Sequence, residues 1–229
     1  MLKLIILPGL DGTGARIRPF MLRLEPAARA HIIAYPTDRA LGYAELEPLI
    51  RAALPAEGRY ALLAESFSGP LAIRIAADPP AGLAGVILCG TFAKNPFPWL
   101  RPVRALAAWL PVKSLPRWLR APLMWDSRDP RDAPPRSMRS ITRVAAAVVR
   151  RRLREVLRAD ETRRLAALKL PVLILTAARD RIVPRSATRI LVQGTPHAQV
   201  VEIDAPHLML QTRPNECATA VLRFLERWN

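Results

Sequence analysis

The sequence predicts an α/β fold: a mostly parallel sheet of about six strands with helices on both of its faces. Short apolar runs alternate with amphipathic stretches of helical length along most of the chain. One of these runs, LAGVILCG at 83–90, is apolar throughout and is typical of a strand that is buried on both faces. With 229 residues, 51% of them hydrophobic, the chain is long enough to bury one sizeable core.

The expected strands share an apolar run that stops at a turn or at a polar residue. They lie at residues 2–7, 30–35, 59–64, 83–90, 171–177 and 199–203. The stretches between them predict helices at 16–24, 43–54, 67–77, 184–193 and 214–228. Strands that alternate with helices of this length favour a parallel sheet with crossover helices.

The alternation breaks at residues 92–168, which are rich in Pro, Arg and Trp and contain helical patterns at 99–110 and 141–157. We interpret this segment as a helical cap insertion between the two parts of a core domain, 1–91 and 169–229. Inserted segments of open α/β sheets often lie over the carboxyl ends of the strands, where ligands bind. The alternative is an irregular connection without a role in substrate binding.

The net charge of +16 is concentrated in the predicted insertion. Between Lys94 and Arg164 there are 18 basic and 6 acidic residues, and the rest of the chain has 17 and 13. Four of the five tryptophans lie in the same segment. The arginine-rich usage of a GC-rich genome explains part of this charge. The remainder suits an acidic acyl carrier or an anionic membrane surface as a partner.

The ends and the cysteines of the chain indicate a cytoplasmic protein. The apolar run at the N-terminus stops at Pro8 and is too short for a signal peptide, and no stretch approaches the ~20 apolar residues of a membrane span. Cys89 and Cys217 are too few for a disulfide framework and lack the spacing of metal ligands. We therefore expect reduced thiols and no metal.

A candidate nucleophile lies in LLAESFSGPLA, where an apolar strand changes abruptly into a helix at Ser66. A serine at such a turn has its hydroxyl held out at the helix N-terminus, and the crowded turn requires small residues two positions before and after it. Here these are Ala64 and Ser68. Many inert serines match this pattern, so the role of Ser66 depends on a base and an acid elsewhere.

The acid and the base are expected at later strand ends. Asp180 follows the strand at 171–177, and His207 follows the strand at 199–203, so the order along the chain is Ser66, Asp180, His207. Of the other histidines, His31 opens an early strand and His197 precedes the last one, at the wrong edge of the sheet.

Two other aspartates fit the role of the acid less well. Asp204 lies at the end of its strand, and Asp160 is a plausible helix cap.

An oxyanion needs backbone N–H donors, and the loop LPGLDGTG at 7–14 follows the first strand. Its glycines let the backbone pass over the serine, so we expect the N–H of Leu10 to be one donor and the N–H of Phe67 to be the other. The alternative for this loop is a phosphate cradle, but its spacing fits neither G-x-G-x-x-G nor a P-loop.

Together these motifs resemble the α/β-hydrolase superfamily across nearly the whole chain. LPGLDGTG looks like the oxyanion loop, AESFSG the nucleophile elbow, ARDRIVP the acid loop and PHLMLQTRPNE the histidine loop. The resemblance implies Ser66 as nucleophile, Asp180 as acid, His207 as base, and Leu10 and Phe67 as oxyanion donors. It also implies a cap at 92–168.

This sequence departs from the family pattern in three places. Pro8-Gly9 replaces His-Gly in the oxyanion loop, and Ala64 and Ser68 replace glycines in the elbow, where Ser68 adds a hydroxyl close to the nucleophile in the chain. The two leading strands of the family are missing, which leaves one sheet edge open as a possible dimer contact.

The expected function is that of a serine esterase or thioesterase that acts on a small or apolar acyl substrate without a cofactor. An acyltransferase would use the same triad. A basic binding module without catalysis is a further alternative: Arg150, Arg151, Arg152, Arg154 and Arg158 lie in one helical pattern. That helix also has an apolar face, so its arginines most simply form a solvated face, and nucleic acid is an unlikely partner.

Overall fold

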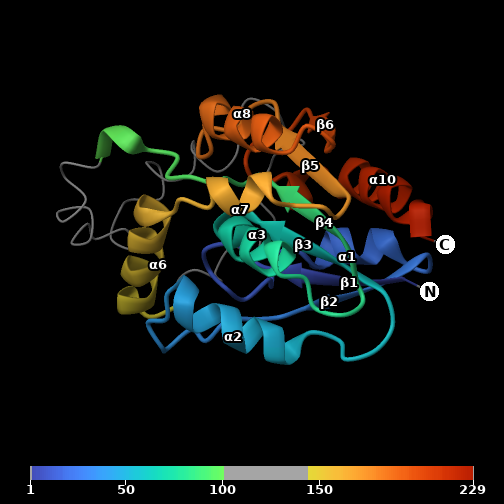
Figure 1. Cartoon of the computed structure of the whole chain (residues 1–229), viewed down its shortest axis with the longest axis horizontal. Coiled ribbons are helices and arrows are strands. Elements are labelled where there is room, and N and C mark those ends of the chain that lie inside the picture. The colour runs from blue at the N-terminus through green and yellow to red at the C-terminus, as the bar shows by residue number, and fades with distance from the viewer. Residues whose placement is uncertain (1, 101–143, 229) are drawn as a thin grey trace.

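The computed structural model describes residues 2–100 and 144–228. Its six strands are β1 (Leu2–Leu7), β2 (Ala28–Ile32), β3 (Tyr60–Glu65), β4 (Leu83–Cys89), β5 (Val172–Ala177) and β6 (Gln199–Ile203). They form one sheet in the order β2-β1-β3-β4-β5-β6, and every neighbouring pair is parallel (Figure 1). The predicted fold class is therefore confirmed, and all six expected strands are present.

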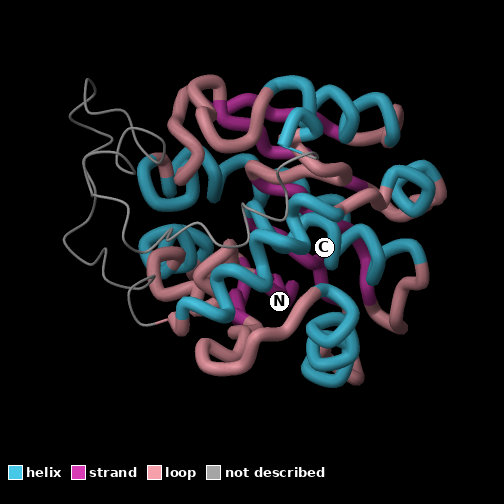
Figure 2. Tube along the Cα trace, turned by 90° about the vertical axis from the view of Figure 1, so that its left-hand side faces the viewer, coloured by secondary structure: helices cyan, strands magenta, loops and turns pink. Residues whose placement is uncertain are grey.

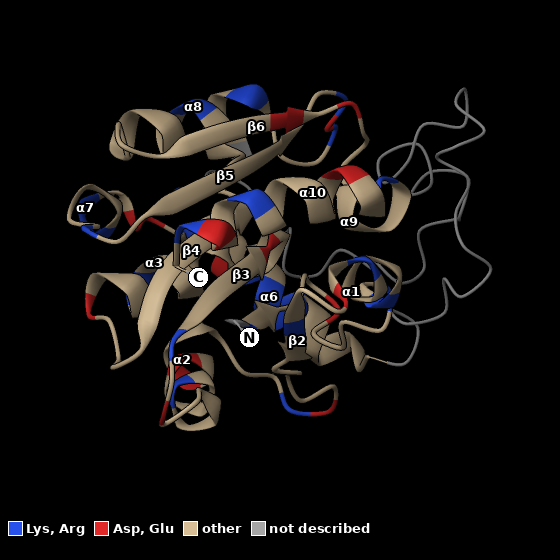
Figure 3. Cartoon of the chain, turned by 90° about the vertical axis from the view of Figure 1, so that its right-hand side faces the viewer, with Lys and Arg blue, Asp and Glu red and all other residues tan. Residues whose placement is uncertain are grey.

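The described helices lie on both faces of this sheet. They are α1 (Arg18–Leu24), α2 (Tyr43–Ala53), α3 (Gly69–Ala77), α6 (Ala146–Arg158), α7 (Thr162–Ala166), α8 (Arg185–Gly194), α9 (Met209–Thr212) and α10 (Pro214–Leu225). Three short 3₁₀ turns occur at Ser66–Ser68, Pro98–Leu100 and Glu226–Trp228. Figure 3 shows α1, α9 and α10 on one side of the sheet and α2, α3 and α7 on the other. In Figure 2 the strands run through the interior between these helices.

Burial along the strands follows their place in the sheet. Every residue of the inner strand β5 is buried, because helices cover both of its faces. The edge strands β2 and β6 have one buried residue each, and their other residues alternate between exposed and partly exposed. β2 begins two residues before the predicted strand, since its ladder with β1 already starts at the pair Leu2–Ala28. No helix among residues 2–100 and 144–228 is both long and apolar enough to cross a membrane.

Residues 92–100 and 144–168 are the described part of the predicted insertion, and they are anchored to the core. The expected helix at 141–157 is α6, whose last turn leads into α7, whereas most of the expected helix at 99–110 lies outside the described residues. The two ends of the insertion pair with each other: the N–H of Asn95 donates to the carbonyl of Ala159, and the N–H of Glu161 donates to that of Ala93. The division of the chain at 92 and 168 stays a prediction, and Leu165 of α7 is buried in the main core.

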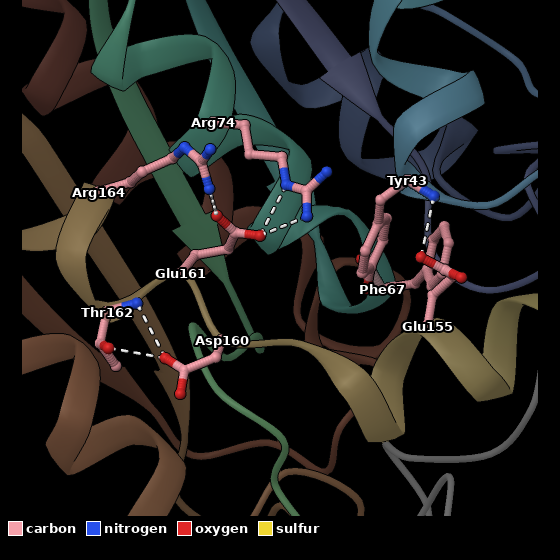
Figure 4. Close-up of polar contacts among 8 residues, drawn as sticks. All are labelled: Tyr43, Phe67, Arg74, Glu155, Asp160, Glu161, Thr162 and Arg164. Carbon is pink, nitrogen blue, oxygen red and sulfur yellow. Dashed lines mark hydrogen bonds and ion pairs between the residues drawn. The ribbon is translucent and has the colours of Figure 1, made fainter.

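A buried carboxylate fixes this anchor to α3. The side chain of Glu161 is 1% exposed and accepts hydrogen bonds from Arg74 Nε at 2.6 Å and from Arg164 Nη1 at 2.7 Å (Figure 4). The guanidinium of Arg74 also lies over the ring of Tyr43, 5.6 Å from its centre. Figure 4 shows these side chains between α2, α3 and α7. The end of the insertion is thus connected to α3, the helix that follows the turn at Ser66.

We expect Glu161→Gln to lower the free energy of unfolding by about 1–3 kcal/mol, because two arginines lose a buried charged acceptor. Urea denaturation of this variant and of Glu57→Gln, a change at an exposed glutamate, would measure the effect. Equal free energies of unfolding for the two variants would contradict the expectation.

Both cysteines are buried thiols, and burial raises the pKa of Cys89 well above its usual value and that of Cys217 to about 12. A thiol reacts as the thiolate, so both should resist Ellman's reagent at mildly alkaline pH in the folded protein. After unfolding in guanidinium chloride, both cysteines should react. Rapid reaction of either thiol in the folded protein would show that its surroundings are not closed.

Candidate active site

The turn after β3 holds Ser66 in a conformation that L-amino acids rarely adopt. Its φ is +51°, and it is the only non-glycine residue with a positive φ among those described. The hydroxyl of Thr91 donates a hydrogen bond to the carbonyl of Ser66. A Cβ on Gly69 would lie 2.0 Å from Thr91 Oγ1, so only glycine lets α3 approach the end of β4 this closely. These features have the geometry of a nucleophile elbow.

The structure brings Ser66, His207 and Asp180 together in a single hydrogen-bonded row. His207 follows β6, and its Nε2 lies 2.9 Å from Ser66 Oγ. Its Nδ1 lies 2.8 Å from Asp180 Oδ2. The other carboxylate oxygen, Asp180 Oδ1, accepts hydrogen bonds from the backbone N–H groups of Ile182 and Val183, both at 2.8 Å. The side chains of His207 and Asp180 are 6% and 7% exposed. An imidazole held in this way can take a proton from the serine hydroxyl.

The alternative histidines and aspartates lie elsewhere. His31 is exposed on β2, and the ring of exposed His197 is hydrogen-bonded through Nε2 to the carbonyl of Leu170 at 3.2 Å. Asp204 pairs with Arg179, and Asp160 bonds to Lys94 and to Thr162 (Figure 4). None of these side chains contacts Ser66.

The loop after β1 is tied to the elbow by a buried pair of hydroxyls. Ser68 Oγ donates to the carbonyl of Pro8 at 2.5 Å, and the hydroxyl of Tyr35 lies 2.6 Å from Ser68 Oγ. Since the serine proton is engaged with Pro8, Tyr35 is the donor. Burial raises the pKa of Tyr35 well above its usual value and keeps this donor protonated. Ser68 is completely buried and points to the loop, so its extra hydroxyl supports the backbone.

The carboxylate of Glu65, the residue before Ser66, binds Gly9, which follows Pro8 in the loop after β1. Glu65 Oε2 accepts from the backbone N–H of Gly9 at 3.1 Å, and Glu65 Oε1 accepts from the side-chain amide of Gln211 at 2.7 Å. Glu65 thereby connects the loop after β1 with helix α9, which follows His207. Glu65 is adjacent to Ser66 in the sequence, but no sequence pattern indicated that Gly9 and Gln211 are its partners.

The carbonyl groups of Leu10 and Phe67, the two expected oxyanion donors, are both hydrogen-bonded within the protein. Among the hydrogen bonds described for residues 2–100 and 144–228, none uses the N–H of Leu10 or of Phe67 as its donor. The neighbouring groups of the loop are occupied: the carbonyl of Gly9 accepts from Gly12, and the carbonyl of Leu10 accepts from Arg152 Nη1 at 2.8 Å. The carbonyl of Phe67 accepts from the hydroxyl of Tyr43 at 2.9 Å. The assignment of these two N–H groups to an oxyanion stays a prediction.

The position of Arg152 corrects one expectation. The arginines of α6 were expected to form a solvated face, yet Arg152 is 0% exposed and lies on the buried face of the helix beside Val148 and Val149. The sequence did not distinguish Arg152 from the neighbouring arginines, because a buried arginine has no sequence signature of its own. Its carbonyl partners come from loops more than a hundred residues earlier in the chain.

In the described ranges, no group of three or more His, Cys, Asp or Glu side chains lies close enough together to bind a metal ion. The expectation of chemistry without a cofactor stays a prediction. The side chains that meet at Ser66 are a hydroxyl, an imidazole and a carboxylate, and such a row of groups can support acyl transfer.

Comparisons with known proteins concern the family and the fold of the chain. The sequence matches the model of a family described as serine aminopeptidase, S33, over residues 46–209, a range that contains Ser66, Asp180 and His207. Among solved structures, an enol-lactonase from Burkholderia xenovorans LB400 is similar with a TM-score of 0.82 and 17% identity, covering 98% of this chain and 91% of that chain. A search of curated proteins gave no significant match.

Two further solved structures share the fold. A hydrolase from Oleispira antarctica has a TM-score of 0.81 and 13% identity, with 99% of this chain and 91% of that chain covered. A structure from a study of carboxylesterases of the thaumarchaeon Nitrososphaera gargenis has a TM-score of 0.74 and 13% identity, with 99% and 90% covered. At these identities the likeness establishes the fold alone.

The hydroxyl pair behind the loop yields a test of its structural role. We expect Ser68→Ala and Tyr35→Phe each to lower the free energy of unfolding by about 1–3 kcal/mol, because each leaves a buried polar atom without its partner. The double variant should cost less than the sum, with a coupling of about 0.5–3 kcal/mol. Urea denaturation measures this cycle, with Ser186→Ala at an exposed position as control. Additive effects would contradict a direct interaction.

Proposed function

The chain belongs to the α/β-hydrolase family described as serine aminopeptidase, S33, and from that membership we propose that it is a serine hydrolase that cleaves carboxylic ester or thioester bonds through Ser66, His207 and Asp180. The observation that carries the proposal is the position of the His207 ring. It lies between Ser66 Oγ at 2.9 Å and Asp180 Oδ2 at 2.8 Å, on a serine that is held in a left-handed turn. A serine with only a structural role would need neither contact.

Acylation would begin when His207 Nε2 takes the proton of Ser66 as its Oγ attacks the acyl carbon. The new C–O bond forms while the carbonyl π pair moves to the oxygen, which gives a tetrahedral oxyanion. Asp180 accepts a hydrogen bond from Nδ1–H, which fixes the tautomer of the ring and stabilises its positive charge. The two backbone N–H groups that hold Asp180 Oδ1 keep this carboxylate in place.

The oxyanion would bind between the N–H groups of Leu10 and Phe67. Each preorganised donor of this kind is worth about 10²–10³ in rate in well-studied cases. When the intermediate collapses, the bond to the leaving oxygen or sulfur breaks, and the proton on His207 passes to that atom. A water molecule then repeats the sequence on the acyl-enzyme, giving its proton to His207 and releasing the acid and the Ser66 hydroxyl.

An apolar acyl group fits the described surroundings of Leu10. This side chain packs against a small cluster of buried residues that α6 and its approach contribute: Val144, Val148 and Val149. The tryptophans of the predicted cap give less support to an apolar acyl site. Trp99 is 71% exposed and makes an edge contact with the ring of Phe97, and the other three tryptophans of the segment lie outside the described residues.

The names of the similar proteins suggest which types of bond to test as substrates. The structural neighbours include an enol-lactonase and carboxylesterases, whereas the family description names an aminopeptidase. An ester and an amide of the same acid differ only in the leaving group at the site proposed here. An acyltransferase would use the same residues with an alcohol in place of water, and the basic surplus of the predicted cap suits an acidic carrier as acyl donor.

We expect wild-type protein to hydrolyse p-nitrophenyl esters from acetate to palmitate with a maximum at one chain length, and Ser66→Ala to lower kcat by about 10⁵–10⁶-fold. Ser186→Ala, which removes the hydroxyl of an exposed serine in α8, should keep wild-type activity. A lactone, a thioester and an aminoacyl p-nitroanilide, measured alongside, would rank the bond types. Activity that persists in Ser66→Ala would contradict the assignment of the nucleophile.

A further inference from the structure

Arg152 is an unusual residue in the centre of this site. Its side chain is completely buried, although it belongs to α6, whose other arginines are at least partly exposed. No ion pair joins it to a carboxylate within the described residues. Burying a guanidinium without a carboxylate is costly unless its N–H groups are satisfied in another way.

Two backbone carbonyls accept protons from the two terminal nitrogens of this guanidinium, whereas its Nε has no hydrogen-bond partner within the described residues. Nη1 donates to the carbonyl of Leu10 and Nη2 to that of Pro36, both at 2.8 Å. The cation also lies over two aromatic rings, 5.5 Å from the centre of Tyr35 and 5.9 Å from that of Phe67. Both expected oxyanion residues, Leu10 and Phe67, are therefore in direct contact with one side chain from α6.

The loop after β1 is shaped around this guanidinium. Gly12 has a φ of +72°, and a Cβ on it would lie 2.5 Å from Arg152 Nη1 and 2.9 Å from its central carbon. Any other residue at position 12 would have to displace the arginine, besides adopting a strained backbone. The close packing of Arg152 against the loop therefore depends on a glycine at position 12.

The contacts of the loop explain what Arg152 does there. Three peptide groups follow one another from Pro8 to Asp11. The N–H of the first, on Gly9, is bound by Glu65, and the carbonyl of the third, on Leu10, is bound by Arg152. The N–H of the middle peptide belongs to Leu10. The carbonyl of the middle peptide, on Gly9, accepts a hydrogen bond from the N–H of Gly12, so a rotation that turned the Leu10 N–H away would break this bond. Arg152 holds the same turn, because it binds the Leu10 carbonyl and packs against Gly12.

We propose that Arg152 is a positioning residue for the oxyanion hole: by binding the Leu10 carbonyl and packing against Gly12, it holds the turn that orients the Leu10 N–H toward the bound acyl group. The position of α6 would then affect the reactivity of Ser66. The inference rests on the proposed function, because it assigns the Leu10 N–H to the oxyanion. The competing explanation is that Arg152 only anchors α6 to the core.

The rate at which Ser66 reacts with an alkyl fluorophosphonate distinguishes these explanations without knowledge of the natural substrate. In this reaction an Oγ–P bond forms, the P–F bond breaks, fluoride leaves, and His207 accepts the serine proton. The phosphoryl oxygen occupies the oxyanion hole. We expect Arg152→Met to lower the second-order rate constant of labelling by about 10- to 100-fold, as a misplaced donor would.

Matched variants separate positioning from anchoring. Arg158→Met removes the same charge from an exposed position of the same helix and should label at the wild-type rate. Arg152→Lys, which can reach only one carbonyl at a time, should fall between wild type and Arg152→Met. Guanidinium ion at a concentration that leaves the protein folded should restore part of the rate of Arg152→Ala. Thermal unfolding of each variant shows how much protein is folded during labelling.

The outcomes are distinct. Labelling of folded Arg152→Met at the wild-type rate would overturn the inference while leaving the proposed function intact. Slow labelling that follows only the unfolded fraction, with no recovery in Arg152→Lys or with guanidinium, would also overturn it and assign Arg152 to anchoring. If wild type is labelled no faster than Ser66→Ala, the proposed function fails and the inference fails with it.

Discussion

The left-handed turn at Ser66 is the constraint around which the rest of the site is organised. A non-glycine residue with a φ of +51° costs about 1–2 kcal/mol relative to an ordinary conformation, so its neighbours must stabilise it. Thr91 binds its carbonyl from the end of β4, and Gly69 removes the Cβ that would keep α3 away from Thr91. The sheet and the first helix after β3 are therefore held at a fixed separation, and that separation decides where the Ser66 hydroxyl points.

Much of this arrangement follows from local sequence. The strand pattern and the order Ser66, Asp180, His207 lead to the sheet and to the row of side chains, because parallel strands put the residues that follow them at one edge. The contacts that sequence reasoning missed are of a different kind. Gly9 and Glu65 are 56 residues apart, and Gln211 and Glu65 are 146 apart. Nothing near these residues in the chain indicates their partners, so they emerge only when the elements have packed.

The charges around the loop after β1 are also few and fixed, despite a net charge of +16 for the chain. Asp11 in the loop pairs with Arg16. Glu65 accepts two hydrogen bonds from neutral groups, and Arg152 donates to two carbonyls. Figure 3 shows basic and acidic residues mixed over the described helices, which is the usual arrangement of a solvated surface. Composition alone does not report which charged groups lie at this loop.

The contact between Arg152 and Leu10 also has a consequence for how the protein matures. It joins residues 142 positions apart, so it can form only after about two thirds of the chain has left the ribosome. Strands β1, β3 and β4 are complete well before that point, and the Ser66 turn can form with them. A nascent chain that has been synthesised only through β4 has the Ser66 turn. It lacks α6 and the later strands that bring Asp180 and His207 to this turn. Asp180 and His207 can therefore join Ser66 only late in synthesis, after the segments that form β5 and β6 have emerged.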